Sequence, residues 1–276
     1  MFNYLYTRHR SLHMKQLLIV FLLLSLTAVS QNKFQLLTAV ETEADHFTTD
    51  NQCNFYVIKR DELIKYNKNG KLLYKYSNKN LGAISYVDAS NMMRVLVYYK
   101  DFSQVVFLDN TLSANGEPLS FDRMGLQQVG VVCTSFNNGM WIYNQQNFSL
   151  MQLNTNYEMV QQTDNLSNLL NIPLAPERIL EHDNRVYMNN PSTGILIFDI
   201  YGTYHKTIPV KNAKEFQVIG DWVYFMQGGK IKAYNIKTTE DTEFNVPATG
   251  FSAFRLEMKA LFLLTSTGIS IYTAEE

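Results

Sequence analysis

The sequence predicts an all-β fold, a six-bladed β-propeller built from four-stranded antiparallel blades. Three observations predict it. One weakly similar unit recurs six times, each unit carries two strand marks at a nearly constant separation, and a strand-like segment precedes the first unit while the last unit ends early. The 17 Tyr and 17 Phe favour strands. No unit contains a sustained apolar period of 3.6 residues, which excludes a helical repeat.

The first mark of each unit is a short apolar strand. Its successive copies lie 40, 46, 45, 37 and 38 residues apart, counted at Tyr56, Leu96, Ile142, Tyr187, Tyr224 and Phe262. Turn-forming residues such as Asp50-Asn51 and Asp183-Asn184 precede this strand. Each unit is therefore expected to begin with an inner strand, a tight turn and this apolar second strand.

The second mark is an aromatic residue or Leu, usually followed by Asp or Asn. It lies 10, 12, 11, 11, 10 and 10 residues after the first mark, at Tyr66, Leu108, Leu153, Phe198, Tyr234 and Tyr272. This mark predicts the end of a third strand and a further turn, in which glycines such as Gly70 and Gly202 can adopt a positive φ. An outer strand follows, for example over residues 71–76 or 203–209.

The two ends of the repeat predict how the ring closes. The sixth unit stops after its third strand, whereas residues 34–40 form a strand-like segment ahead of the first unit. Pairing that segment into the last blade would leave no open sheet edge. We therefore expect the N-terminal strand to complete the last blade.

The units resemble the blades of NHL-type and quinoprotein-like propellers. The resemblance covers residues 34–272, and its pattern is clearest from Asp183-Asn184 through Phe198-Asp199 to Gly202. The chain is also similar in style to uncharacterised envelope propellers of the Bacteroidetes. The resemblance implies a fold and no particular activity, and no cofactor-specific set of residues accompanies it, so no cofactor is expected.

The N-terminus is typical of a secretory signal. Met14-Lys15 opens a stretch with an apolar run at residues 17–26 and small residues before Gln31. We predict cleavage after Ser30, which divides the chain into a presegment and signal at 1–30 and a propeller at 31–276. Met1 and Met14 both remain possible starts, and an uncleaved signal anchor is the competing interpretation. The apolar run is shorter than the ~20 residues that a spanning helix needs.

Composition narrows the localisation and the partners. No Cys lies at the cleavage site, so the expected product is periplasmic or associated with the outer membrane without a lipid anchor. The formal net charge of −1, with no basic stripe, argues against nucleic acid. Cys53 and Cys133 are expected as buried apolar residues, with one disulfide as the alternative. The isolated chain is expected to be monomeric.

One short segment is a weak candidate for metal chemistry. Glu181, His182 and Asp183 could supply an acid, a base or metal ligands at the channel of a hydrolase or lactonase. The competing interpretation is that they close the first turn of the fourth unit. No nucleophile elbow, His-x-x-x-His pair or phosphate-binding glycine loop occurs, so no catalytic residue is assigned.

The two longest connections are the candidate binding surface. Residues 119–130 and 163–176 are unusually apolar for loops, and long loops are often functional. They are expected to form a platform for a protein partner or else a cap on the blades, through Phe121, Met124, Leu126, Leu166, Leu169, Leu170 and Ile172.

These features favour a non-catalytic interaction scaffold of the bacterial envelope, in an outer-membrane assembly or secretion complex. Two alternatives stay open. One is a metal-dependent propeller hydrolase or lactonase, and the other is a propeller that binds a small ligand or glycan through exposed aromatic residues.

Overall fold

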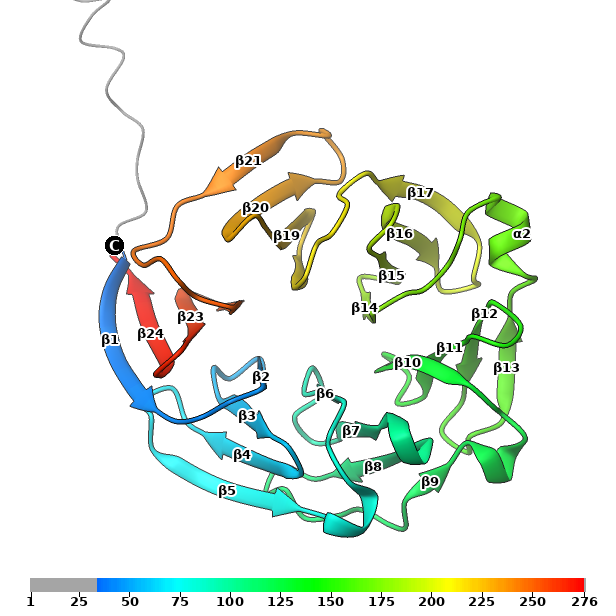
Figure 1. Cartoon of the computed structure of the whole chain (residues 1–276), viewed down its shortest axis with the longest axis horizontal. Helices are drawn as coiled ribbons and strands as arrows, with labels where there is room; N and C mark the ends of the chain where they lie inside the picture. Colours follow the sequence, from blue (N-terminus) through cyan, green and yellow to red (C-terminus); the bar gives the residue numbers. More distant parts are fainter. Residues whose placement is uncertain (1–33, 276) are drawn as a thin grey trace, which may run out of the picture. The chain divides into compact units, whose positions relative to one another are not determined.

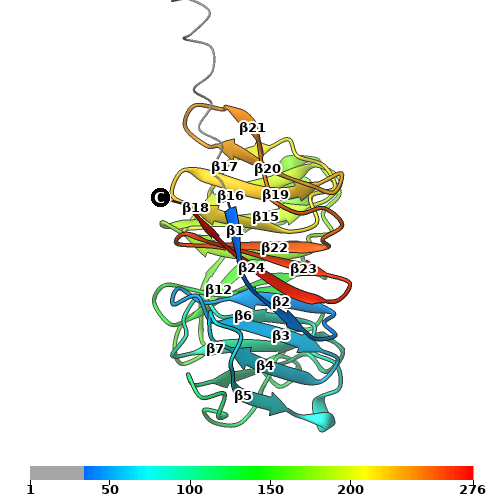
Figure 2. The same ribbon diagram turned by 90° about the vertical axis from the view of Figure 1, so that its left-hand side faces the viewer.

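The computed structural model describes residues 34–275, and these residues form six four-stranded antiparallel sheets arranged around one axis (Figure 1). The predicted signal and its cleavage site lie outside the described residues. Seen from the side, the sheets stand as the blades of a wheel (Figure 2). The six-bladed propeller predicted from the repeat is therefore confirmed.

Each blade is built outward from a first strand at the axis. The first strands are β2 (His46–Thr49), β6 (Tyr86–Asp88), β10 (Val129–Thr134), β14 (Arg178–His182), β18 (Phe216–Ile219) and β22 (Ala253–Glu257). The second strands are β3 (Phe55–Lys59), β7 (Val95–Tyr99), β11 (Met140–Asn144), β15 (Arg185–Asn190), β19 (Trp222–Gln227) and β23 (Ala260–Thr265).

The outer half of each blade follows the same order. The third strands are β4 (Glu62–Tyr66), β8 (Gln104–Leu108), β12 (Ser149–Leu153), β16 (Gly194–Asp199), β20 (Lys230–Asn235) and β24 (Gly268–Ala274). The outer strands are β5 (Leu72–Ser77), β9 (Leu119–Ser120), β13 (Met159–Gln162), β17 (Tyr204–Ile208), β21 (Asp241–Phe244) and β1 (Phe34–Glu41). The described helical segments are η1 (Lys79–Leu81), η2 (Lys100–Phe102), η3 (Asp122–Met124) and α2 (Leu166–Leu170).

The Asp or Asn that follows the third strand explains the second mark of the repeat. The side chain of Asn67 accepts hydrogen bonds from the backbone N–H groups of Asn69 and Lys71, both at 3.0 Å. Asp199 does the same with the residues two and four positions further on, at 2.8 and 2.9 Å. The side chain thus closes the turn that reverses the chain into the outer strand.

The N-terminal strand closes the ring, as the ends of the repeat predicted. β1 pairs antiparallel with β24, from Phe34 opposite Ala274 to Glu41 opposite Gly268, with one bulge between Leu36 and Thr38. In Figure 1 the blue β1 lies along the red β24. The last blade therefore contains both ends of the described chain.

The core consists of apolar layers between neighbouring blades. One layer, for example, joins Tyr56 of the first blade to Val97 of the second, and another joins Phe55 to Phe262 of the last blade. All of these side chains are less than 1% exposed. Because each blade is covered on both faces, the second strands read as continuous apolar runs. Within residues 34–275 no helix is long and apolar enough to cross a membrane.

Candidate functional site

The first strands surround a central channel whose two ends differ in how the chain connects. All first strands run in the same direction, because every blade repeats the same strand order. The turns between first and second strands therefore gather at one end, which we call the turn face. The connections that lead from one blade to the next gather at the other end, which we call the loop face.

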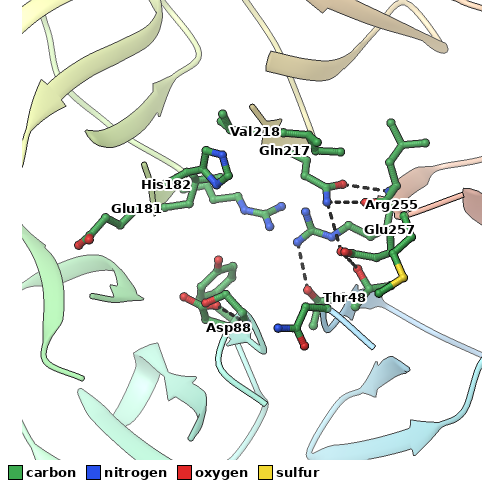
Figure 3. Close-up of a pocket in the computed structure, with 17 residues that line it drawn as sticks. Thr48, Asp88, Glu181, His182, Gln217, Val218, Arg255 and Glu257 are labelled. Carbon is green, nitrogen blue, oxygen red and sulfur yellow. Dashed lines mark hydrogen bonds between the residues drawn. The ribbon is translucent and has the colours of Figure 1, made fainter. Parts of the chain in front are cut away.

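Two arginines meet in the middle of the channel. Arg255 of β22 is only 7% exposed, and its Nη2 donates a hydrogen bond of 3.1 Å to Thr48 Oγ1. In Figure 3 its guanidinium extends toward the centre of the ring. Arg178 of β14 forms an ion pair with Glu215, 2.6 Å from Nη1 to Oε2, and lies beside the ring of Tyr86. The Nε atoms of both arginines are buried without a hydrogen-bond partner among the described residues.

The electrostatics of this pair reflect burial and mutual repulsion. Burial, together with the nearby positive charge of Arg178, lowers the pKa of Arg255 to about 10. Burial also opposes the charge on Arg178, but Tyr86 and Glu215 outweigh it and its pKa is raised. Burial raises the pKa of Tyr86 to about 12, so its hydroxyl is neutral at neutral pH. Both guanidinium groups are therefore charged within a confined space.

The turn-face mouth is lined by carboxylates that already have partners on neighbouring blades. Glu181 accepts hydrogen bonds of 2.6 Å from Ser135 Oγ and from Trp141 Nε1. Figure 3 shows its carboxylate directed away from the centre of the channel. Asp88 Oδ2 accepts two bonds of 2.8 Å from the backbone N–H and hydroxyl of Thr134. These groups connect adjacent blades, which is a structural use of charged side chains.

Glu257 makes the same kind of connection at the ring closure. Its Oε1 accepts hydrogen bonds from Thr49 Oγ1 at 2.6 Å and from Gln217 Nε2 at 3.2 Å. These partners belong to the first and fifth blades, on either side of the last one. Burial raises the pKa of Glu257, although both hydrogen bonds favour its ionised form. A cavity of about 330 Å³ lies within this mouth.

The structure separates the residues suggested for metal chemistry. Glu181 is held by the third blade, as described above, whereas His182 Nε2 lies 3.3 Å from Asp183 Oδ2 in the turn of its own blade. Among residues 34–275 no three His, Cys, Asp or Glu side chains gather as a metal site would require. Cys53 and Cys133 are both buried free thiols in separate blades.

The structure places the predicted platform residues mostly against the blades. Phe121 and Leu166 are fully buried, whereas Leu169 on α2 is 63% exposed. The remaining four residues are half-buried against the blade clusters: Met124, Leu126, Leu170 and Ile172. Residues 119–130 also include the outer strand β9, so this segment is not a connection throughout.

The turn face carries a set of exposed apolar side chains that the sequence did not single out. Each belongs to a different blade and lies at or beside the turn after the first strand. Their exposed fractions are 60% for Met93, 68% for Phe136, 40% for Ile219 and 84% for Met258. Single apolar residues in short turns follow no periodic pattern in the sequence. They come to the same face only because the blades close into a ring.

Met258 also occupies a strained backbone position. Glu257 pairs with Ala260, so Met258 is the first residue of a two-residue turn, and its φ is 51°. The corresponding position of the fifth blade holds Gly220, with φ 55°, which is the residue type that tolerates this conformation. Other bulky residues of this ring, such as Phe148 and Tyr157, also have a positive φ, so Met258 differs from them mainly in its exposure.

Comparisons with known proteins support the fold and leave the function open. No family model matches the chain, and no curated protein matches its sequence. Virginiamycin B lyase from Staphylococcus aureus is 12% identical with a TM-score of 0.62, covering 88% of this chain and 100% of its own. BamB from Moraxella catarrhalis is 9% identical with a TM-score of 0.55, covering 87% and 100%. BBS1N, solved in complex with ARL6DN, is 12% identical with a TM-score of 0.53, covering 81% and 75%.

Proposed function

We propose that the protein is a non-catalytic interaction scaffold of the bacterial cell envelope. In this proposal it is exported, lies in the periplasm or at the outer membrane without a lipid anchor, and serves as an accessory subunit of an assembly or secretion complex. The exposed apolar side chains of the turn face carry the proposal. Four blades each contribute one of them to this face. Ile219 and Met258 line its central mouth and Phe136 lines an adjoining pocket, and apolar residues exposed on one face favour an interaction surface.

The chemistry of the turn face indicates what kind of partner it would bind. Its apolar side chains lie around a mouth whose carboxylates already accept hydrogen bonds from neighbouring blades, as described above, and Asp183 beside them has a side chain that is 74% exposed. A complementary partner would present mainly apolar side chains, with a basic one opposite Asp183. The carboxylates at this mouth bind neighbouring blades, and this structural use of theirs supports a non-catalytic role.

Replacing Met258 should separate binding from folding. Met258→Asn removes the most exposed apolar side chain of the turn face and inserts a residue that tolerates a positive φ. We expect the free energy of unfolding to stay unchanged or to rise by up to about 1 kcal/mol, since strain is relieved. Co-purification of the envelope partner from the native cells should fall several-fold.

Leu169→Asn is the matched control, because Leu169 is 63% exposed on α2, in a connection of the loop face. It should leave co-purification unchanged. Equal co-purification with the parent protein and with Met258→Asn would argue against the turn face as the binding surface.

A further inference from the structure

The buried charge of Arg255 has no carboxylate in direct contact among the described residues, and only the more distant Glu215 and Glu257 favour it. Its side chain is more than nine-tenths buried, yet no carboxylate within residues 34–275 lies within 4 Å of its guanidinium. Its single hydrogen bond goes to the hydroxyl of Thr48, and its Nε has no partner. Burying an unpaired cation costs free energy of folding, so an anion bound beside Arg255 would offset part of that cost.

Arg178 adds a second cation that is only partly compensated. Its Nη1 binds Glu215, but its Nε is also buried without a partner. The other carboxylates near the channel centre, Asp88 and Glu257, are held by hydrogen bonds from Thr134 and Thr49. The constriction therefore contains two guanidinium groups and one carboxylate that pairs with either of them.

The cavity on the loop-face side is lined by three cationic side chains and two carboxylates. It measures about 250 Å³, and its cations are Arg178 and Arg255 at the inner end and Lys214 further out. Its carboxylates are Glu215, which pairs with Arg178, and Glu177, which is exposed. Since one water occupies roughly 30 Å³, this cavity has room for a small organic or inorganic anion.

We propose that this loop-face cavity binds a small oxyanion of the phosphate or polycarboxylate class, held by the guanidinium groups of Arg255 and Arg178. Guanidinium groups present paired N–H donors that match both carboxylate and phosphate oxygens. The neutral hydroxyl of Tyr86 supplies a further donor at the same end of the cavity. The loop-face cavity opens at the opposite end of the channel from the turn face, and Arg178, Arg255 and Tyr86 lie between it and the turn-face cavity, which they also line.

The test is calorimetric titration of the purified protein with inorganic phosphate and with citrate, at an ionic strength matched with sodium chloride. We expect one saturable site for at least one of them and a concentration-dependent rise in melting temperature. Binding of phosphate alone or of citrate alone would identify the class. Absence of saturable binding by both would overturn the proposal.

Two variants connect the binding to these residues. Arg255→Gln should weaken binding at least tenfold, while Arg123→Gln, which changes an exposed arginine of η3, should leave it unchanged. Glu215→Gln should tighten binding about tenfold, because it removes the carboxylate that competes for Arg178. A gain in affinity cannot arise from misfolding. Unchanged affinity in both Arg255→Gln and Glu215→Gln would show that the anion binds elsewhere.

Discussion

The connections on the two faces of the ring differ in how far they bury their apolar side chains. On the loop face, the long connections turn Phe121 and Leu166 into the blades, where both are fully buried. On the turn face, short turns hold Phe136 and Met258 in solvent. Long connections can fold back and cover their own apolar groups, whereas a turn of two to five residues cannot. The length of a connection therefore indicates where apolar residues are used for packing and where they remain available to a partner.

Removing the strand that closes the ring should lower stability more than any other change, and it tests whether both faces depend on ring closure. Deleting residues 34–40 removes most of β1 and exposes the edge of β24. We expect one cooperative loss of stability that affects both faces together, seen as a large fall in melting temperature by circular dichroism. An unchanged melting temperature would show that ring closure contributes little.

A second prediction separates the packed part of the loop face from its exposed part. Leu166→Ala should cost about 2–5 kcal/mol, because it leaves a cavity at the fully buried first residue of α2. Leu169→Ala, three residues later and 63% exposed, should change the free energy of unfolding by less than about 0.5 kcal/mol. Chemical denaturation measures both. Similar losses in the two variants would contradict the view that α2 packs through one side only.

The weakest effect that we predict is a pH dependence of folding stability, which comes from Glu257 at the turn-face mouth. Burial raises the pKa of Glu257 above its ordinary value of 4.5, so the folded state binds a proton more tightly than the unfolded state does. The stability that this group contributes is complete below pH 4.5 and is lost as the pH rises through the folded pKa. In Glu257→Gln this part of the pH dependence should disappear. A difference between parent and variant that grows as the pH falls would mean that the sign is wrong.

The sequence predicted the blades because their signals are local. Each second strand contains an apolar run, and residues such as Asn67 and Asp199 close their turns within four positions. The strand that completes the last blade was predicted from the ends of the repeat alone. These signals need no knowledge of which residues meet in space.

The channel and the turn face could not be predicted in the same way. Arg178 and Arg255 lie on separate blades and follow no local pattern, so only the closed ring brings them to one constriction. Glu181 was considered as a ligand because of its neighbours in sequence, but its hydrogen bonds go to Ser135 and Trp141 on another blade. The apolar character of the platform residues is visible in the sequence, whereas their burial depends on how each connection folds back.

Site-specific photo-cross-linking in the native cells shows directly which face meets the partner. A photoreactive amino acid would replace Met258 or Phe136 on the turn face, and Leu169 or Phe102 on the loop face. All four residues are at least 47% exposed, so each can reach a bound protein. We expect the two turn-face positions to capture the same envelope protein and the two loop-face positions to capture none. Capture of that protein from Leu169 or Phe102, with none from Met258 and Phe136, would contradict the proposed binding surface.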